Sequence, residues 1–537
     1  MWTVTLVLLA LGLRELASWY FRSRTTPANL AAQHNQAPNL NAETLGPGSK
    51  ELYADEEAQT PSKVVERTEG EVKVPPLSAV TYPVSQEPST AVVTDQGILS
   101  HAHSFVMYNP VLNNINANKE KVLRWLAKFT IPGAEFDSSL RIPPPECHPG
   151  TRLELLRDIR AWIENTLCAQ RLLWLRGSAG VGKSAIIQTV AEGLSASSKL
   201  GASLFFSRPN KREKPTLVFP TIAYQLAVRV PFYKEYLARK MADDPKLLEK
   251  DMMSQFRVLI AEPFAKGTTG NSDVWAILLD GLDECEGEDA QKLIIRLVSQ
   301  FTMQNPTSLL VWVIASRPEV HLIQCFGSDA IVDSVLVYDV PVDSGDACRD
   351  VENYLRESFT KIRDEFRDLL PTNTLWPGET AESQICRSAL GHFGVVSTMI
   401  RFIGDLHVCD PVAQLGIVMS STPAEDSFID PLSTLHSLYT RILEAVPPNL
   451  LPVLKLLITY VLAVADNDDD LLMNLKGKAP LVVAATLLNL QQHTVYAALR
   501  KLHSVIKVPS PKDSASQSIL FYHASFADYL RDQVNTL

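Results

Sequence analysis

The stretch LLWLRGSAGVGKSAIIQTV, residues 172–190, decides the fold of this 537-residue chain. Its first four residues are apolar and predict a buried strand, and the apolar spacing after Ser184 predicts a helix. Between them, GSAGVGKS satisfies the pattern G-x-x-x-x-G-K-[ST]. Glycines let successive backbone N–H groups face phosphate oxygens, and the following helix N-terminus favours an anion. The stretch therefore predicts a phosphate-binding loop between a strand and a helix.

Two side chains of this loop carry distinct chemistry. Lys183 supplies a positive charge to the β- and γ-phosphates of a nucleoside triphosphate, and the hydroxyl of Ser184 is a ligand for magnesium. We expect ATP or ADP with Mg²⁺ to contact the whole loop, which consists of Gly177, Ser178, Ala179, Gly180, Val181, Gly182, Lys183 and Ser184.

An acidic segment follows a second apolar run in VWAILLDGLDECEG, residues 274–287. The run predicts a strand that brings Asp280 to the carboxyl edge of a sheet, where it can hold magnesium together with Ser184. Asp283 and Glu284 come next, and either carboxylate could orient an attacking water. The alternative is a solvated acidic loop, because further acidic residues continue the run. The sequence leaves the choice between Asp283 and Glu284 open.

A third apolar run, LLVWVIA, ends in Ser316, Arg317 and Pro318. An arginine at the end of a strand parallel to the other two could approach the γ-phosphate. The alternative is a surface arginine that caps a turn.

The remaining pattern predicts an α/β fold followed by helices. Apolar runs also occur at residues 202–206 and 334–338, separated by segments long enough for helices. Continuous apolar runs with helices between them indicate a parallel sheet that is covered on both faces. Residues 345–420 are mainly helical in pattern, and from residue 432 helical periods give way to the strand-like SVIKV and ILFYHASF, as in a winged helix.

The amino-terminal part predicts no enzyme. Residues 1–24 are largely apolar, but Arg14 and Glu15 interrupt the run. Inserting these two charges into a membrane costs about 5 kcal/mol, which offsets the contribution of about -4 kcal/mol from the apolar residues. Residues 25–98 are rich in Pro, Ser, Thr and Glu and indicate a disordered linker, followed by a short ordered segment at 99–142. We expect a cytoplasmic protein with residues 1–24 as a candidate membrane tether.

Composition narrows the partners. A net charge of -10 disfavours unspecific nucleic-acid binding. The seven cysteines lack paired spacing and lie mostly in apolar periodic segments, as at Cys168 and Cys386, which predicts free thiols in a reducing compartment.

Five motifs together resemble the NACHT family of signal-transduction ATPases, and within it the fungal members with nephrocystin-like modules. They are GSAGVGKS, LLDGLDE, ASRPE, FGVVSTMIRFI and HASFADYL. The resemblance covers about three quarters of the chain, from Gly133 to the carboxyl end. The acidic motif discriminates best, because the family pattern of Asp, a small residue, an apolar residue and Asp-Glu matches residues 280–284 in order.

The resemblance implies an architecture and further contacts. The sheet would belong to the additional-strand class, with the strand before Arg317 between those before Gly177 and Asp280. A nucleotide-binding domain would span residues 143–342, a helical domain 343–425 and a winged-helix domain 426–537. Backbone contacts to adenine would come from Pro149, Gly150, Thr151 and Arg152, whereas the proline that related receptors place against adenine is absent from GHFGVVS at 391–397. His523 would reach the β-phosphate of ADP; the alternative is a core histidine.

The function implied is a slow, regulated ATPase switch. Its nucleotide state would control conformation and self-association with a homo-oligomer in the ATP state, together with unidentified protein partners, as in innate or non-self recognition. The alternative is a nucleotide-stabilised scaffold with little turnover. A GTPase is disfavoured, because guanine is normally recognised by an Asn/Thr-Lys-x-Asp element late in the fold, and NKRE at 210–213 lies before the acidic motif and ends in Glu.

Overall fold

The structure is a computed structural model that describes residues 115–141, 143–165, 170–265, 274–342, 344–370, 376–422, 430–466 and 480–536. The expected apolar segment 1–24 and linker 25–98 lie outside these ranges. Within the described ranges, no helix is both long enough and apolar enough to cross a membrane. The structure therefore does not support the expected membrane tether, and that expectation was wrong.

Five parallel strands form the central sheet in the order β2-β3-β4-β1-β5. They are β1 Leu172–Arg176, β2 Leu200–Phe205, β3 Trp275–Asp280, β4 Leu310–Ser316 and β5 Val335–Asp339. Strand β4 lies between β1 and β3, which is the additional-strand arrangement. The predicted fold class, an α/β P-loop NTPase sheet followed by a helical region, is confirmed.

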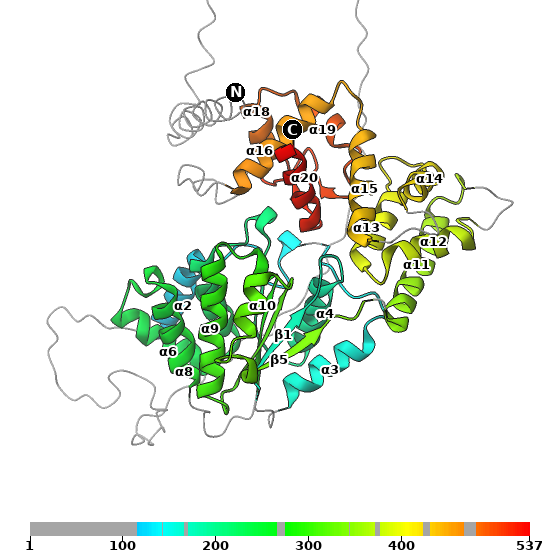
Figure 1. Ribbon diagram of the computed structural model, residues 1–537. Coiled ribbons are helices and arrows are strands. Elements are labelled where there is room, and N and C mark those ends of the chain that lie inside the picture. The colour runs from blue at the N-terminus through cyan, green and yellow to red at the C-terminus, as the bar shows by residue number, and fades with distance from the viewer. Residues whose placement is uncertain are drawn as a thin grey trace, which may run out of the picture. The chain divides into compact units, whose positions relative to one another are not determined.

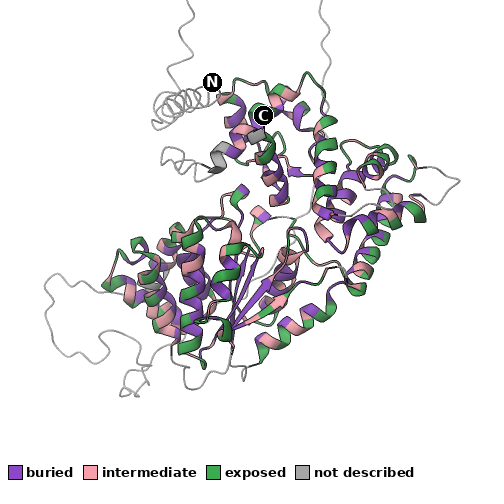
Figure 2. Ribbon diagram, in the orientation of Figure 1, coloured by how far each residue is buried: buried purple, intermediate pink, exposed green. Residues whose placement is uncertain are grey.

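The register of the strands aligns their carboxyl ends along one edge of the sheet. Arg176 of β1 pairs with Ser316 of β4, and Asp280 of β3 pairs with Ala315 of β4 and Phe205 of β2. Every residue of β2, β3 and β4 is buried, as Figure 2 shows. Buried continuous runs explain why the apolar patterns in the sequence do not alternate.

Helices cover both faces of the sheet (Figure 1). On one face, α3 Leu153–Glu164 and α4 Lys183–Ala196 pack against Leu173 and Val313. On the other face, an apolar core holds α5 Val218–Arg229, α9 Glu288–Gln304 and α10 Val320–Phe326 against Trp174 and Trp312. The same core includes α6 Pro231–Asp243 and the short helices α7 Met252–Phe256 and α8 Glu262–Phe264.

The amino-terminal helix α2 Ile115–Leu126 belongs to that second core as well, through Val122 and Leu126. The helix lies in the segment 99–142 for which the sequence predicts order, and residues 99–114 of that segment lie outside the described ranges.

A separate apolar core joins the elements that follow the sheet. They are α11 Gly345–Glu365, α12 Glu379–Ala389, α13 Phe393–Ile403, α14 Pro411–Ser421, α15 Pro431–Glu444, α16 Leu451–Asp466, α18 Leu481–Leu487, α19 Gln492–Leu499, β6 Ile506–Lys507, β7 Leu520–Phe521 and α20 Ala524–Thr536. The expected helical character of residues 345–420 is confirmed. The domain boundaries and the winged-helix assignment stay predictions, since this one core spans both expected domains.

The strand expected over ILFYHASF is shorter than its apolar pattern suggests. Strand β7 comprises only Leu520–Phe521 and pairs with β6 in antiparallel fashion. Helix α20 begins at Ala524, directly after His523, whose Nδ1 accepts a hydrogen bond from the backbone N–H of Ser525. A side chain that satisfies one of the first N–H groups of a helix favours a helix start at that point.

Candidate nucleotide-binding site

The phosphate-binding loop leaves β1 at Arg176 and enters α4 at Lys183. Gly182 has a φ of 98°, in the region that side chains other than glycine rarely adopt, and this turn lets the helix start at Lys183. The Lys183 ammonium donates to the carbonyl oxygens of Gly177 at 2.7 Å and Ser178 at 2.9 Å. The loop therefore has the strand, turn and helix context that the motif requires.

Helix α13 begins directly against this loop. The backbone N–H of Gly394 donates to Gly180 O at 2.7 Å, and the ring Nε2 of His392 lies 3.1 Å from Ser178 Oγ. A Cβ at position 394 would lie 2.7 Å from the Gly180 Cα, so glycine is required for this approach. The segment 391–397, which includes the start of α13 and contains no proline, thus contacts the phosphate-binding loop.

Asp280 and Ser184 meet the requirements of a magnesium site. Asp280 is buried at the end of β3, and its Oδ1 has no hydrogen-bond partner among the described residues. Burial raises the pKa of Asp280 to about 6, and a hydrogen bond from Ser184 together with the charge of Lys183 acts in the opposite direction. A buried carboxylate oxygen without a partner beside a hydroxyl fits a hard cation.

The described residues hold no cluster of three or more His, Cys, Asp or Glu side chains that could bind a metal ion. Magnesium is usually held by one or two carboxylates with phosphate oxygens and water, so Ser184 and Asp280 are sufficient protein ligands. When bound, the ion would neutralise charge on the phosphate oxygens.

The Asp283 carboxylate forms a hydrogen bond and an ion pair with Arg317. The Arg317 backbone N–H donates to Asp283 Oδ1 at 3.0 Å, and the guanidinium Nε lies 3.3 Å from Asp283 Oδ2. The guanidinium also donates from both terminal nitrogens to Asp528 of α20 at 3.2 Å. Arg317 therefore lines the same pocket as Lys183, and two carboxylates hold it, one of them supplied by α20.

Glu284 is held differently from Asp283. Its Oε2 accepts a hydrogen bond from the backbone N–H of Arg208 at 3.1 Å. Removal from water, and then the nearby Asp283 carboxylate, raises the pKa of Glu284 to about 7. A carboxylate with a pKa near neutrality is suited to accept a proton at physiological pH. Among the described residues, no arginine side chain forms an ion pair with Glu284, whereas Arg317 pairs with Asp283, so the Glu284 carboxylate is the more available of the two for orienting water.

His523 reaches the same site from the carboxyl-terminal part of the chain. Burial, together with the positive charges of Arg317 and Lys183, lowers its pKa to about 3, so the ring is neutral. Nδ1 faces the backbone N–H of Ser525 at 3.2 Å and the Ser525 hydroxyl at 2.5 Å, and we assign Nδ1 as the acceptor of both, which puts the ring proton on Nε2 at the opposite side of the ring. The imidazole can therefore donate one hydrogen bond away from α20.

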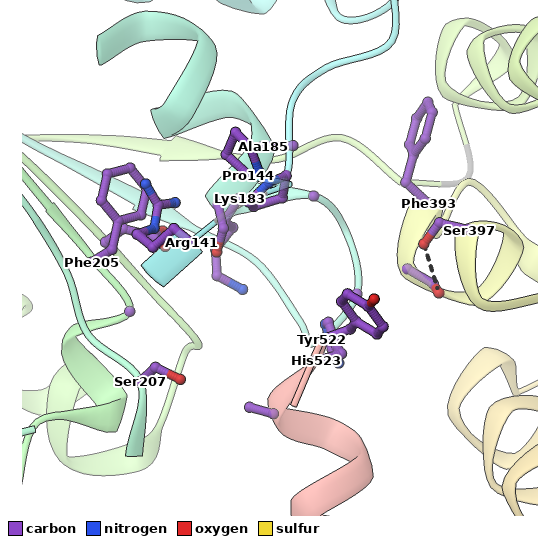
Figure 3. Close-up of a pocket in the computed structure, with 18 of the residues that line it drawn as sticks. Arg141, Pro144, Lys183, Ala185, Phe205, Ser207, Phe393, Ser397, Tyr522 and His523 are labelled. Carbon is purple, nitrogen blue, oxygen red and sulfur yellow. Dashed lines mark hydrogen bonds between the residues drawn. The ribbon is translucent and has the colours of Figure 1, made fainter. Parts of the chain in front are cut away.

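These groups line one pocket of about 460 Å³. Figure 3 shows Lys183 near its centre, with Tyr522 and His523 entering from the segment before α20 and Phe393 on α13. The lining includes the following predicted residues: Ala179, Gly180, Val181, Gly182, Lys183, Ser184, Asp280, Asp283, Glu284, Arg317 and His523. Gly177 and Ser178 do not line the pocket, and their carbonyl oxygens accept hydrogen bonds from the Lys183 ammonium. Of the residues expected near adenine, Thr151 and Arg152 line the pocket.

Arg152 connects three segments around this pocket. Its backbone N–H donates to Asp350 Oδ2 at 2.9 Å, and its guanidinium donates to Pro341 O at 2.7 Å and to Val181 O and Gly391 O at 3.4 Å. Arg152 also adopts a left-handed conformation with a φ of 56°. A strained backbone that is held by several hydrogen bonds fixes the turn before α3 against the phosphate-binding loop.

Two arginine side chains that line the pocket belong to none of the motifs found in the sequence. The Arg141 guanidinium lies over the ring of Phe205, 3.5 Å from the ring centroid, and Figure 3 shows Arg141 and Phe205 side by side. Arg141 also donates to Gln188 Oε1 at 2.6 Å. Arg212 donates from Nε to Phe205 O at 3.1 Å. Burial lowers the pKa of each to about 10, and the charge of Asp280 opposes this effect in both. Arg212 follows β2, and β2 ends at the same edge of the sheet as the strands that carry the motifs. This position in the sequence could have identified Arg212 as a residue of the site.

Comparisons with known proteins agree with the nucleotide-binding part of the chain. Residues 150–317 match the family described as Nephrocystin 3, N-terminal, and this range includes the phosphate-binding loop, Asp280 and Arg317. No curated protein matches the chain in sequence.

Solved structures give weak overall likeness. A Walker-type ATPase of Pyrococcus abyssi aligns with 72% of this chain and 98% of its own, at 15% identity and a TM-score of 0.33. Structures of Drosophila ORC with Cdc6, bound to GC-rich and to AT-rich DNA, align with 80% and 78% of this chain and 84% and 81% of theirs, at 9% and 10% identity and TM-scores of 0.26 and 0.24. Scores of this size carry no argument about activity or partners.

The strand order and the strand-loop-helix geometry around residues 177–184 give the sheet region the α/β fold of a P-loop NTPase, and residues 150–317 of it match the nephrocystin family model.

Proposed function

We propose that the chain is an ATP-dependent switch of the NACHT type, related to fungal proteins with nephrocystin-like modules, and that it hydrolyses ATP slowly. The observation that carries this proposal is the position of His523 and Arg317 in the same pocket as Lys183 and Glu284. A residue from the far carboxyl-terminal part lies at the phosphate site, so the bound nucleotide can influence how that part is held.

Each residue has a role in the proposal. Lys183 binds the β- and γ-phosphates, and Ser184 with Asp280 holds magnesium. Glu284 accepts a proton from the attacking water, and Asp283 positions Arg317. Arg317 detects the γ-phosphate by exchanging its partner Asp528 for the phosphate, because both are anions with acceptor oxygens.

The nucleotide state then determines assembly. His523 donates from Nε2 to the β-phosphate of ADP, which stabilises the arrangement described above. ATP draws Arg317 away from Asp528, and the freed carboxyl-terminal part permits self-association and the binding of protein partners. The resemblance to NACHT proteins supports the oligomeric step.

A nucleotide-stabilised scaffold is the second candidate. One observation favours it: Arg317 is held by Asp283 and Asp528 at the same time, which would keep it from any γ-phosphate. Such a protein would bind nucleotide and act through partners with little turnover.

Competition binding among ATP, ADP and GTP, followed by single-turnover hydrolysis at saturating protein, tests the proposal. Lys183→Ala should lose ATP binding, because the ammonium faces two phosphates, whereas Lys199→Ala should retain it, since that lysine pairs with Glu164 on the surface. Wild-type affinity in the Lys183 variant would contradict the site. Bound ATP that stays uncleaved would favour the scaffold. Light scattering with ADP and with a non-hydrolysable ATP analogue should show a larger mass in the second case, and equal masses would refute the assembly step.

A further inference from the structure

A short turn follows β2 at the carboxyl edge of the sheet, and we call residues 207–212 the 207–212 turn. Ser207 and Arg212 form an isolated antiparallel bridge, in which Ser207 N donates to Arg212 O at 3.2 Å and Arg212 N donates to Ser207 O at 3.0 Å. Asn210 N also donates to Ser207 O at 3.1 Å. A turn closed by three backbone hydrogen bonds holds its side chains in fixed directions.

One side of the 207–212 turn holds the acidic loop. Arg208 donates from its backbone N–H to Glu284 Oε2 at 3.1 Å and from its guanidinium to Asp283 O at 3.2 Å. The residue before the turn, Phe206, donates from its backbone N–H to Asp280 O at 2.9 Å. The orientation of the Glu284 carboxylate therefore depends on the position of this turn.

The other side of the turn holds the carboxyl-terminal segment through one side chain, Asn210. Its Nδ2 donates to Ser207 Oγ at 2.9 Å and to Phe521 O at 3.3 Å, and its Oδ1 accepts from Phe521 N at 3.2 Å. Both amide protons and one carbonyl lone pair are used, and Phe521 N can only donate, so the orientation of the amide is fixed.

Phe521 occupies a position close to the proposed phosphate contact. It is the last residue of β7 and lies two residues before His523. The next amide, Tyr522 N, donates to Val505 O, whereas Phe521 N turns to Asn210. Asn210 therefore binds both the backbone N–H and the carbonyl oxygen of Phe521, two residues before His523.

We propose that Asn210 is a positioning residue that couples the His523 segment to the Glu284 carboxylate through the 207–212 turn. Displacement of β7 breaks both Asn210–Phe521 hydrogen bonds and releases the turn that orients Glu284. ADP retention and hydrolysis then depend on the same amide, whose residue also lines the pocket. This coupling rests on the function proposed above.

Two measurements on the full chain test the coupling. Hydrogen exchange at the Phe521 amide reports the contact itself, and displacement of a fluorescent ADP by excess ATP, with single-turnover hydrolysis, reports its effect. Asn210→Ala should speed both the Phe521 exchange and the ADP release about tenfold, the change expected from two lost hydrogen bonds, and should slow hydrolysis. Asn305→Ala, which removes an amide bonded to Phe301 O at the end of α9, is the matched control and should change neither.

Asn210→Asp provides a second variant if the alanine variant does not fold. It keeps an acceptor for Phe521 N but sets a carboxylate oxygen against Phe521 O in place of the donor, so ADP release should again be faster than in wild type. Faster Phe521 exchange with unchanged ADP release and hydrolysis would overturn the coupling and leave only a structural contact. Unchanged exchange would overturn the contact. A wild-type protein that binds no nucleotide would instead overturn the proposed function, and the coupling with it.

Discussion

Arg317 and Asp528 form an ion pair between the end of β4 and helix α20, with both terminal guanidinium nitrogens 3.2 Å from the same carboxylate oxygen. The side chain of Arg317 also contacts Asp283 at 3.3 Å. An arginine that faces the phosphate-binding loop is therefore shared between the acidic loop and the carboxyl-terminal helix. An anion that takes the N–H groups now bonded to Asp528 must displace that carboxylate.

Asp528→Asn should raise the affinity for ATP relative to ADP about three- to tenfold. The substitution keeps the shape of the side chain and removes the charge that competes with a γ-phosphate for Arg317. The measurement is the ratio of the ATP and ADP dissociation constants in both proteins. Glu444→Gln is a suitable control, because it removes an exposed carboxylate that pairs with Arg441 within α15. An unchanged ratio would mean that Asp528 has no role in nucleotide discrimination.

Glu284→Gln should preserve ATP binding and slow hydrolysis about 10²- to 10⁴-fold, the contribution of a positioned general base. The amide keeps the acceptor for Arg208 N and loses the ability to take a proton. Asp283→Asn should instead disturb the position of Arg317, since Arg317 occupies both of its oxygens. Single-turnover rates with pre-bound ATP separate the two. A greater loss in Asp283→Asn than in Glu284→Gln would assign the base to Asp283.

The hydrolysis rate of the wild-type protein should rise as pH rises through about 7. The pKa of Glu284 is raised to about 7, mainly by burial, and only the carboxylate accepts a proton from water. The rate should therefore be low at pH 5.5 and reach a plateau above pH 8. A single-turnover profile that is flat from pH 5.5 to 8.5 would exclude Glu284 as the titrating base.

Sequence periodicity was sufficient for the sheet. The apolar runs at 172–175 and 334–338 correspond to β1 Leu172–Arg176 and β5 Val335–Asp339, because strands buried on both faces leave a continuous apolar pattern. The motif residues Lys183, Asp280 and Glu284 could also be predicted from the sequence, since parallel strands end at one edge of the sheet and fixed motif spacing identifies their loops.

The partners of the motif residues could not be predicted in the same way. Asp528 and Phe521 reach Arg317 and Asn210 only because the helical core after β5 packs its last elements toward the phosphate-binding loop. Nothing in local spacing encodes such contacts. His523 was placed on a strand for a related reason: alternating and helical patterns overlap in short apolar runs, and the hydrogen bond from Ser525 N to its ring decides the helix start.

Glu213 should make the protein less stable as pH rises from about 4.5 to 7. Burial raises its pKa to about 7, and its Oε2 has no hydrogen-bond partner among the described residues. Its folded-state pKa is above the unfolded value, so the folded protein binds more protons in this window and loses stability as pH increases. The loss is at most about 3.4 kcal/mol, from about 2.5 pKa units at 1.36 kcal/mol each. Urea unfolding at pH 5 and 8 should show a smaller loss in Glu213→Gln, and equal losses would refute the assignment.

His523→Ala should speed ADP release and increase self-association. The neutral ring presents its Nε2 proton to the pocket, and a hydrogen bond to a phosphate contributes roughly 1.5 to 3 kcal/mol. Its loss should shift the equilibrium away from the arrangement that ADP stabilises, toward the one with a freed carboxyl-terminal part, by about one to two orders of magnitude. The measurements are the ADP off-rate and the mass in solution at saturating ADP.

The same ring also caps α20, so a second variant must separate the two roles. His523→Asn keeps a side chain that can cap a helix N-terminus and is too short to reach a phosphate, whereas His523→Ala loses both contacts, and a lost cap costs about 1 kcal/mol. Both variants should release ADP at similarly increased rates, and only the alanine variant should lose thermal stability. An unchanged off-rate together with a lower thermal midpoint in His523→Ala would make His523 a purely structural residue.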